Sequence, residues 1–162
     1  MSTYTNVASP AVHHDFIRTG LFIGVAGGLA EIPVVWLYSA LTGGDAAAVA
    51  RDVASAVGLD GASAAAGVAT HMGLAVALGI VLSAMVQSLA ALLASRRAIW
   101  TFMMGSLAAV WAINYFIVLP VVSPSFVHLL PYAITLASKL AFGVAAAAAL
   151  QVLRPVRVSL YH

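Results

Sequence analysis

The residues best able to do chemistry in this chain are one acid and one base that lie inside long apolar stretches. Glu31 and Lys139 are the only acidic and basic side chains within these stretches. At about 1.5 Å per helical residue, Glu31 lies about 18 Å and Lys139 about 21 Å from the same side. An unpaired charge in hydrocarbon is costly, so we expect the two to form an ion pair. Asn114, about 22 Å from that side, is expected to complete this mid-membrane polar layer.

The ion pair has a structural and a functional interpretation. The structural one, which we favour, is a bridge that fixes helix register, because one pair without a second acid is sparse for transport. The functional one is a proton or ion relay, with Glu31 as the coupling acid. In that case an outer polar stripe would lead to it, formed by His71, His128, Tyr132 and Thr135.

Two histidines raise the question of a metal or haem. His71 lies about 33 Å from Leu93, which predicts a place at the membrane interface and not beside the ion pair. His71 and His128 could ligate a haem between two helices, but two histidines alone are a weak signal. No metal and no cofactor are therefore predicted; haem is a minor alternative, and bound lipid is expected. We interpret the cluster of His13, His14 and Asp15 as a solvated segment before the first span.

Catalytic and nucleic-acid-binding motifs are missing from the sequence. There is no cysteine and no HExxH, Walker, GxGxxG or GxSxG sequence. The net charge of +2 rests on a handful of residues and forms no basic patch. An enzyme is therefore not expected, and neither is a nucleic-acid partner.

The elements that must position these side chains are transmembrane helices. The 162 residues are 63% hydrophobic and 7% charged, whereas about 25% is usual in soluble domains. So few charges cannot cover a water-facing surface, which excludes a soluble globular domain. A span needs about 20 apolar helical residues. The sequence therefore predicts an all-α integral membrane protein, a single bundle of four transmembrane helices over 19–41, 64–93, 99–121 and 127–153.

The arginines predict the orientation of the bundle. Five of the six fall on one side of a four-span arrangement, so both termini are expected in the cytoplasm. The flanking segments are predicted to be a mobile start at 1–15 and a short cytoplasmic tail at 155–162. The five arginines are Arg18, Arg96, Arg97, Arg154 and Arg157.

The loop between the first two spans predicts a short amphipathic helix on the outer surface. Asp45 is expected to cap it, and Gly58 lies near its end. Val49, Val53 and Val57 recur every four residues and give it an apolar side. A segment packed across the helix ends is the interpretation we favour over a free surface helix.

Glycines predict where the first span meets a neighbour. Gly20, Gly24 and Gly27 follow steps of four and three that lead to Glu31, and Gly28 extends a GxxxG pattern. Small residues on one helical stripe allow another helix to approach closely. Glu31 is therefore expected to face the bundle and not the lipid.

Two prolines predict breaks in the helices. Pro33 clashes with the carbonyl of Leu29 and predicts a kink in the first span. Ser123 is expected to cap a short helix that runs to about Leu130 and bends at Pro131.

The function expected first is that of a non-catalytic accessory subunit in a larger energy-transducing membrane complex. Little of the chain lies outside the spans, and its smooth Ala- and Gly-rich helices suit packing against other transmembrane subunits or further copies. The alternatives are a small oligomeric proton or cation transporter and a haem-binding membrane cytochrome. One lysine against six arginines, with abundant alanine, points to a bacterial inner membrane.

Overall fold

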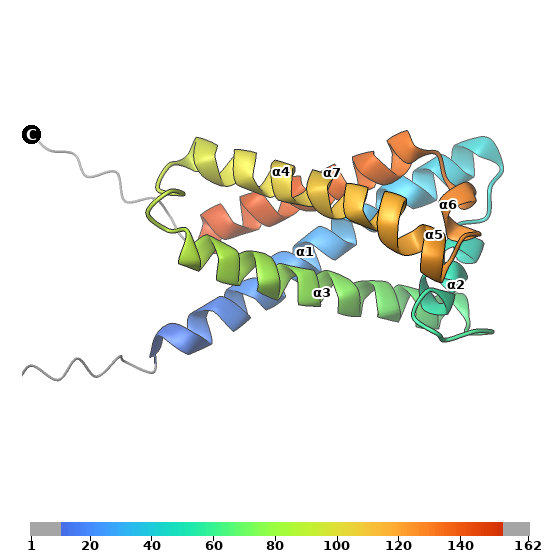
Figure 1. The fold of residues 1–162 in the computed structure, drawn as a ribbon, viewed down its shortest axis with the longest axis horizontal. Coiled ribbons are helices and arrows are strands. Elements are labelled where there is room, and N and C mark those ends of the chain that lie inside the picture. The colour runs from blue at the N-terminus through green and yellow to red at the C-terminus, as the bar shows by residue number, and fades with distance from the viewer. Residues whose placement is uncertain (1–10, 154–162) are drawn as a thin grey trace, which may run out of the picture.

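A computed structural model describes the backbone of residues 11–153 and the side chains of residues 16–153. Within this range the protein is all-helical (Figure 1). Four helices are long and apolar enough to cross a membrane, and a short helix lies between the first two. The predicted mobile start, the predicted tail and the side chains of the His13 cluster lie outside the described residues. The candidate spans are Phe16–Thr42, Ala64–Ser88, Arg96–Val122 and Tyr132–Leu153.

The first two long helices differ from the predicted spans at their ends. Helix α1 (Ala11–Thr42) begins earlier than the predicted 19–41, because a helix continues through polar residues that hydropathy does not count. Helix α3 (Ala64–Ser88) ends before the predicted residue 93. Its apolar sequence continues, but the chain turns after Ser88 and the next helix starts at a serine cap. Pro33 lies inside α1, which stays one continuous helix.

The third span is a composite of three helical segments. Helix α4 (Arg96–Ile113) passes into a π-helical turn, η1 (Asn114–Val118), and then into α5 (Leu119–Val122). The N–H of Leu119 donates to the carbonyl of Asn114, five residues back. Pro120 follows at once, and its ring would clash with the carbonyl of Phe116 in a regular helix. The wider turn gives that ring room.

The predicted 127–153 span is two helices. Helix α6 (Phe126–Leu129) is followed by Leu130 in an extended conformation, and α7 (Tyr132–Leu153) starts after Pro131. The bend therefore lies where proline predicted it. The Ser123 side chain does not cap α6; instead its carbonyl accepts from the Phe126 N–H.

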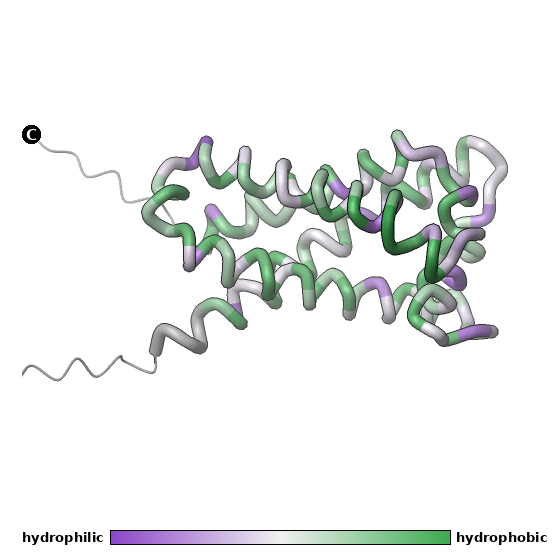
Figure 2. The backbone as a smooth tube through the Cα atoms, in the orientation of Figure 1, coloured by the Kyte–Doolittle hydropathy of each residue, from purple (hydrophilic) through white to green (hydrophobic). Residues whose placement is uncertain are grey.

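Only some pairs of neighbouring long helices make extensive contact in the described structure. Helix α1 packs against α3 and α7, and α4 packs against α7. Among the described residues the backbones of α3 and α4 come close at few points, although one short turn joins the two helices. Figure 1 shows α2 (Ala46–Ser55), α5 and α6 at one end of the bundle, which we call the α2 end. Figure 2 shows hydrophobic residues along the long helices and polar ones mostly towards the turns.

The α1–α3 contact depends on glycines. A Cβ atom on Gly24 would lie 2.7 Å from the Ala75 carbonyl oxygen, and one on Gly79 would meet the backbone of Gly20. The predicted stripe serves two neighbours, because Gly20, Gly24 and Gly28 lie against α3 whereas Gly27 faces the Phe142 ring of α7. The close approach leaves no room for larger side chains at this crossing.

The buried core lies on the side of Glu31 and Lys139 that is away from α2. Its fully buried members come from all four long helices and include small alanines that let the helices close up. The bundle is therefore densely packed in the half that holds the α3–α4 turn. The largest of these side chains are Ile23, Leu82, Met103, Leu107, Phe142 and Leu150.

Candidate functional site

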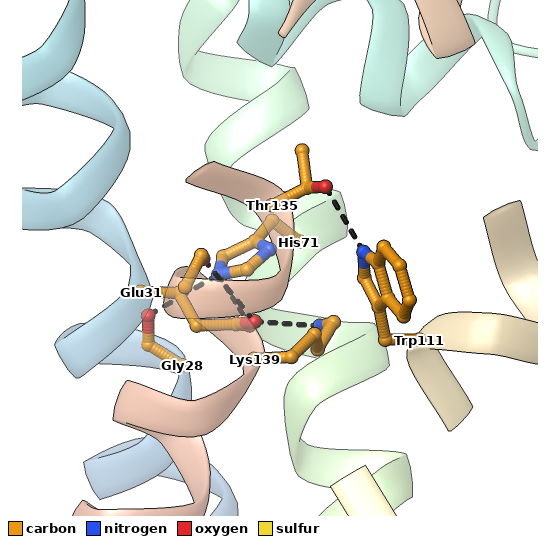
Figure 3. A network of polar contacts seen from close by, with 7 residues as sticks. Gly28, Glu31, His71, Trp111, Thr135 and Lys139 are labelled. Carbon is orange, nitrogen blue, oxygen red and sulfur yellow. Dashed lines mark hydrogen bonds and ion pairs between the residues drawn. The ribbon is translucent and has the colours of Figure 1, made fainter. Parts of the chain in front are cut away.

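Glu31 is the centre of a buried polar cluster in the middle of the bundle (Figure 3). Its side chain projects from α1 and is 3% exposed. Lys139 Nζ on α7 lies 2.6 Å from Glu31 Oε1, and the Ser138 hydroxyl donates to the same oxygen at 3.5 Å. Lys139 also lies over the Phe142 ring, 5.8 Å from its centroid. The acid and base that the sequence singled out are therefore in direct contact.

His71 lies beside Glu31, which differs from the interfacial place expected from its depth. Its Nε2 is 3.2 Å from the Gly28 carbonyl oxygen and 3.6 Å from Glu31 Oε2. The estimate counted from Leu93, beyond the end of α3. Counted from Ser88 and from Phe16, where the candidate spans end and begin, His71 and Glu31 lie about 26 and 23 Å deep. His71 therefore belongs to the polar layer and not to an outer stripe.

The second carboxylate oxygen of Glu31 is left without a hydrogen bond. Oε2 is buried and has no hydrogen-bond partner among the described residues. The 3.6 Å to His71 is too long for a hydrogen bond. A buried carboxylate oxygen without a hydrogen bond is unusual in the interior of a folded protein. Glu31 can therefore accept a proton or a donor group without breaking its contact to Lys139.

Two cavities meet at the Glu31–Lys139–His71 cluster. The first, about 410 Å³, lies between α1, α2, α3 and α7. The second, about 440 Å³, lies between α3 and the α4–η1–α5 segment. All three charged or titratable side chains line both cavities, and so does Tyr115. The half of the bundle towards α2 is therefore hollow.

The other predicted residues of the polar layer and stripe do not join the ion pair. Asn114 lines the second cavity but makes no side-chain hydrogen bond to the pair. Thr135 accepts a 2.9 Å hydrogen bond from Trp111 Nε1 and donates to the Tyr132 carbonyl. His128 is exposed on α6 and lines neither cavity. The two cavities that His71 lines therefore do not include His128, and the haem alternative stays a prediction.

The structure also contains an aromatic cluster beside the polar layer, which the sequence did not predict. Trp111 stacks on Tyr115 at 5.7 Å between centroids, and both rings meet Tyr132 edge-on. The Tyr115 hydroxyl is buried and has no hydrogen-bond partner in the described part of the chain. The signal in the sequence was the spacing of Trp111 and Tyr115, four residues apart on one helical face. Its partner Tyr132 is distant in sequence and gave no local sign.

Helix α2 covers the first cavity. The Asp45 side chain caps it by accepting from the Ala47 N–H at 2.8 Å and contacts Arg51 at 2.9 Å. The backbone N–H groups of Ala48 and Ala47, together with Arg51, hold the pKa of Asp45 below its ordinary value of 3.8. Val49 is buried, and α2 packs against α3 so closely that Ala50 contacts Gly67. The helix is thus packed across the bundle end.

Among residues 16–153, whose side chains the structure describes, no group of three His, Asp or Glu residues could hold a metal ion. Comparison with protein families, curated proteins and solved structures found no match. The site is therefore interpreted from its own geometry.

Proposed function

We propose that the protein is a small membrane transport protein in which Glu31 carries the coupling proton and Lys139 is its counter-charge. The observation that carries this proposal is the unpaired Oε2 of Glu31, buried where two cavities meet. His71 stands 3.6 Å from that oxygen and is able to exchange a proton with it.

The cavities favour this proposal over a purely structural ion pair. A buried pair that only fixes register is expected to be enclosed by packed side chains, because water or empty space beside it adds nothing to the bridge. Here both partners line open volume, and Lys139 is 24% exposed. The interpretation that the sequence favoured, an ion pair that only fixes helix register in an accessory subunit, does not account for that volume.

The division of the bundle favours a carrier over an open pore. The cavities lie towards the α2 end, whereas the opposite half is closed by fully buried side chains such as Leu82, Leu107 and Phe142. Passage would require those helices to move, and the α1–α3 crossing at Gly24 and Gly79 offers smooth contact surfaces for it. We place both termini in the cytoplasm of a bacterial cell, so that the cavities face outward.

The test is Glu31-dependent proton flux in proteoliposomes. Purified protein is reconstituted, a pH gradient is imposed, and internal pH is followed with a trapped dye. Glu31→Gln is expected to abolish protein-dependent flux, because the amide cannot carry the proton. Asp60→Asn is the matched control, since it removes one exposed carboxylate from the loop before α3. Equal flux in wild type and Glu31→Gln, with both proteins folded, would refute the proposal.

A second candidate function is that of a subunit in a larger membrane assembly, supported by the exposed position of α4. Among the described residues α4 packs against a single other long helix, α7. Native mass spectrometry of protein extracted from its own membrane in mild detergent tests this. Co-purifying subunits in fixed stoichiometry support it, and a chain that is isolated alone contradicts it.

A further inference from the structure

We propose that the two cavities form one binding site for a membrane-partitioning monocarboxylate, which enters between α3 and α4 and is held by Lys139 as Glu31 takes up a proton. The inference rests on the proposed function in one respect, that Glu31 is the proton site. It adds the class of substrate and the route of entry.

The route of entry follows from the sparse backbone contact between α3 and α4. The second cavity occupies that seam, and its walls are apolar side chains from both helices. Leu74 on α3 is 51% exposed, and Val118 on η1 is exposed as well. In a bilayer such a seam meets lipid chains and not water. A ligand that enters there must dissolve in the membrane. The wall residues are Leu74, Leu78, Val110, Val118, Leu119 and Val122.

The cavity interior fits a small amphiphile. Each volume, about 410 and 440 Å³, lies in the range of about 300 to 1,000 Å³ that is usual for small-molecule sites. Most of the lining is aliphatic, with polar groups gathered at the Glu31 cluster. A bare cation would find few oxygen ligands here. An apolar chain with one polar head matches the lining.

The charges select a carboxylate head over an amine head. An amine that paired with Glu31 Oε2 would place two ammonium groups on one carboxylate, and the described cavity lining offers no second acid. A net positive charge in hydrocarbon is costly. A carboxylate that arrives while Glu31 is protonated leaves Lys139 with a partner. The net charge of the site stays the same in that exchange.

The binding step transfers one proton and neither forms nor breaks any other covalent bond. Glu31 takes a proton on Oε2, the oxygen that lacks a partner. The N–H groups of Lys139 then turn from Glu31 Oε1 to the carboxylate of the ligand. The Tyr115 hydroxyl, 6% exposed as a residue and unpartnered in the described structure, lines both cavities and can donate to the same head group.

Three neighbouring elements present a titratable side chain to the cavities around Glu31. Helix α3 presents His71, α7 presents Lys139, and η1 presents Tyr115. Helix α2 lines the first cavity with alanine and valine side chains. The proton taken up with the ligand therefore goes to Glu31, beside the side chains of His71 and Lys139.

The test measures ligand binding and proton uptake on the purified full chain in detergent. Radiolabelled octanoate, octylamine, octanol and propionate are compared by equilibrium dialysis. Octanoate is expected to bind at least tenfold more tightly than each of the others. In weakly buffered solution, close to one proton should be taken up per octanoate. Equal binding of octylamine would overturn the choice of head group, and equal binding of propionate would overturn the apolar chain.

Variants connect the binding to the named residues. Lys139→Gln is expected to weaken octanoate binding at least tenfold. Glu31→Gln should keep or strengthen binding but lose the proton uptake, because the competing carboxylate is gone. Leu74→Trp should weaken binding at least fivefold by filling the seam, whereas Val81→Trp, on α3 outside both cavities and 54% exposed, should not. Unchanged binding in Lys139→Gln and Leu74→Trp would refute the inference.

The proposed function and the inference fail in different ways. Glu31-dependent proton flux in liposomes, with no octanoate binding, refutes the carboxylate site and leaves the transport proposal standing. Octanoate binding with proton uptake, but no Glu31-dependent flux in liposomes even when octanoate is added, supports the site and refutes transport.

Discussion

Removal of Lys139 should destabilise the protein in a way that depends on pH. In Lys139→Met the buried Glu31 loses the partner at 2.6 Å, while the aliphatic part of the side chain is kept. Breaking a buried ion pair from one side costs about 3–5 kcal/mol. The carboxyl can limit that cost by protonation. Protonating a solvated glutamate in the unfolded chain costs about 1.4 kcal/mol for each pH unit above about 4.3.

This limit gives the magnitude of the effect. At pH 7 protonation would cost about 3.7 kcal/mol, which lies within the range for breaking the pair, and at pH 5 only about 1 kcal/mol. Lys139→Met should therefore lose about 3 to 4 kcal/mol at pH 7 and about 1 kcal/mol at pH 5. The double variant Glu31→Gln with Lys139→Met should recover most of the loss at pH 7, because no buried charge is left.

The assay is reversible unfolding in mixed micelles, followed by circular dichroism at both pH values. The wild type and the single and double variants form a double-mutant cycle. A Lys139→Met protein as stable at pH 7 as the wild type would show that Glu31 is not held as a carboxylate in the bundle. The same penalty at both pH values would refute the protonation argument.

Three further predictions concern other contacts. Asp45→Asn should speed hydrogen exchange in α2 at pH 6. Because folding lowers the pKa of Asp45, the stability that its carboxylate gives to α2 is present above pH 3.8 and is lost as the pH falls through the lower folded pKa. Equal exchange at pH 6 would contradict the capping role. Gly79→Ala should cost about 1–3 kcal/mol in unfolding free energy by pushing α1 away, whereas Gly105→Ala, with open space around it, should be neutral or stabilising; equal effects would contradict the close helix crossing. Trp111→Phe should cost about 1 kcal/mol by removing the 2.9 Å hydrogen bond to Thr135, and an unchanged unfolding free energy would count against it.

The long helices could be predicted from the sequence because hydropathy measures what a bilayer requires. The four apolar stretches, the cap at Asp45 and the break at Pro131 each have a local signal. Helix ends were less accurate, as at Ser88, because apolar residues also occur in the turn after it. The π-helical turn at Asn114 follows from proline in the next turn, but its geometry depends on the whole span.

The candidate site could be predicted only in part. The contact of Glu31 with Lys139 followed from charge and depth, since each had one available partner. The contact of His71 with Glu31 depends on where α3 ends and on the glycine contacts that set the α1–α3 crossing, so depth counting from the wrong end misplaced it. The cavities depend on contacts that are not made between α3 and α4, and no local pattern reports those.

In the carrier that we propose, the position of the ion pair between the packed half and the half with the cavities would link its charge state to helix movement. Lys139 is on α7 and contacts Phe142, which fills the space beside Gly27 in the packed half. When Lys139 turns from Glu31 to another carboxylate, one of the contacts that join α1 to α7 at this level is released. Where Gly24 and Gly79 meet in the α1–α3 crossing, backbone packs against backbone, and we expect α1 to shift there. A change of partner at Glu31 can thereby open the packed half, which is the movement that a carrier with its cavities at the α2 end requires.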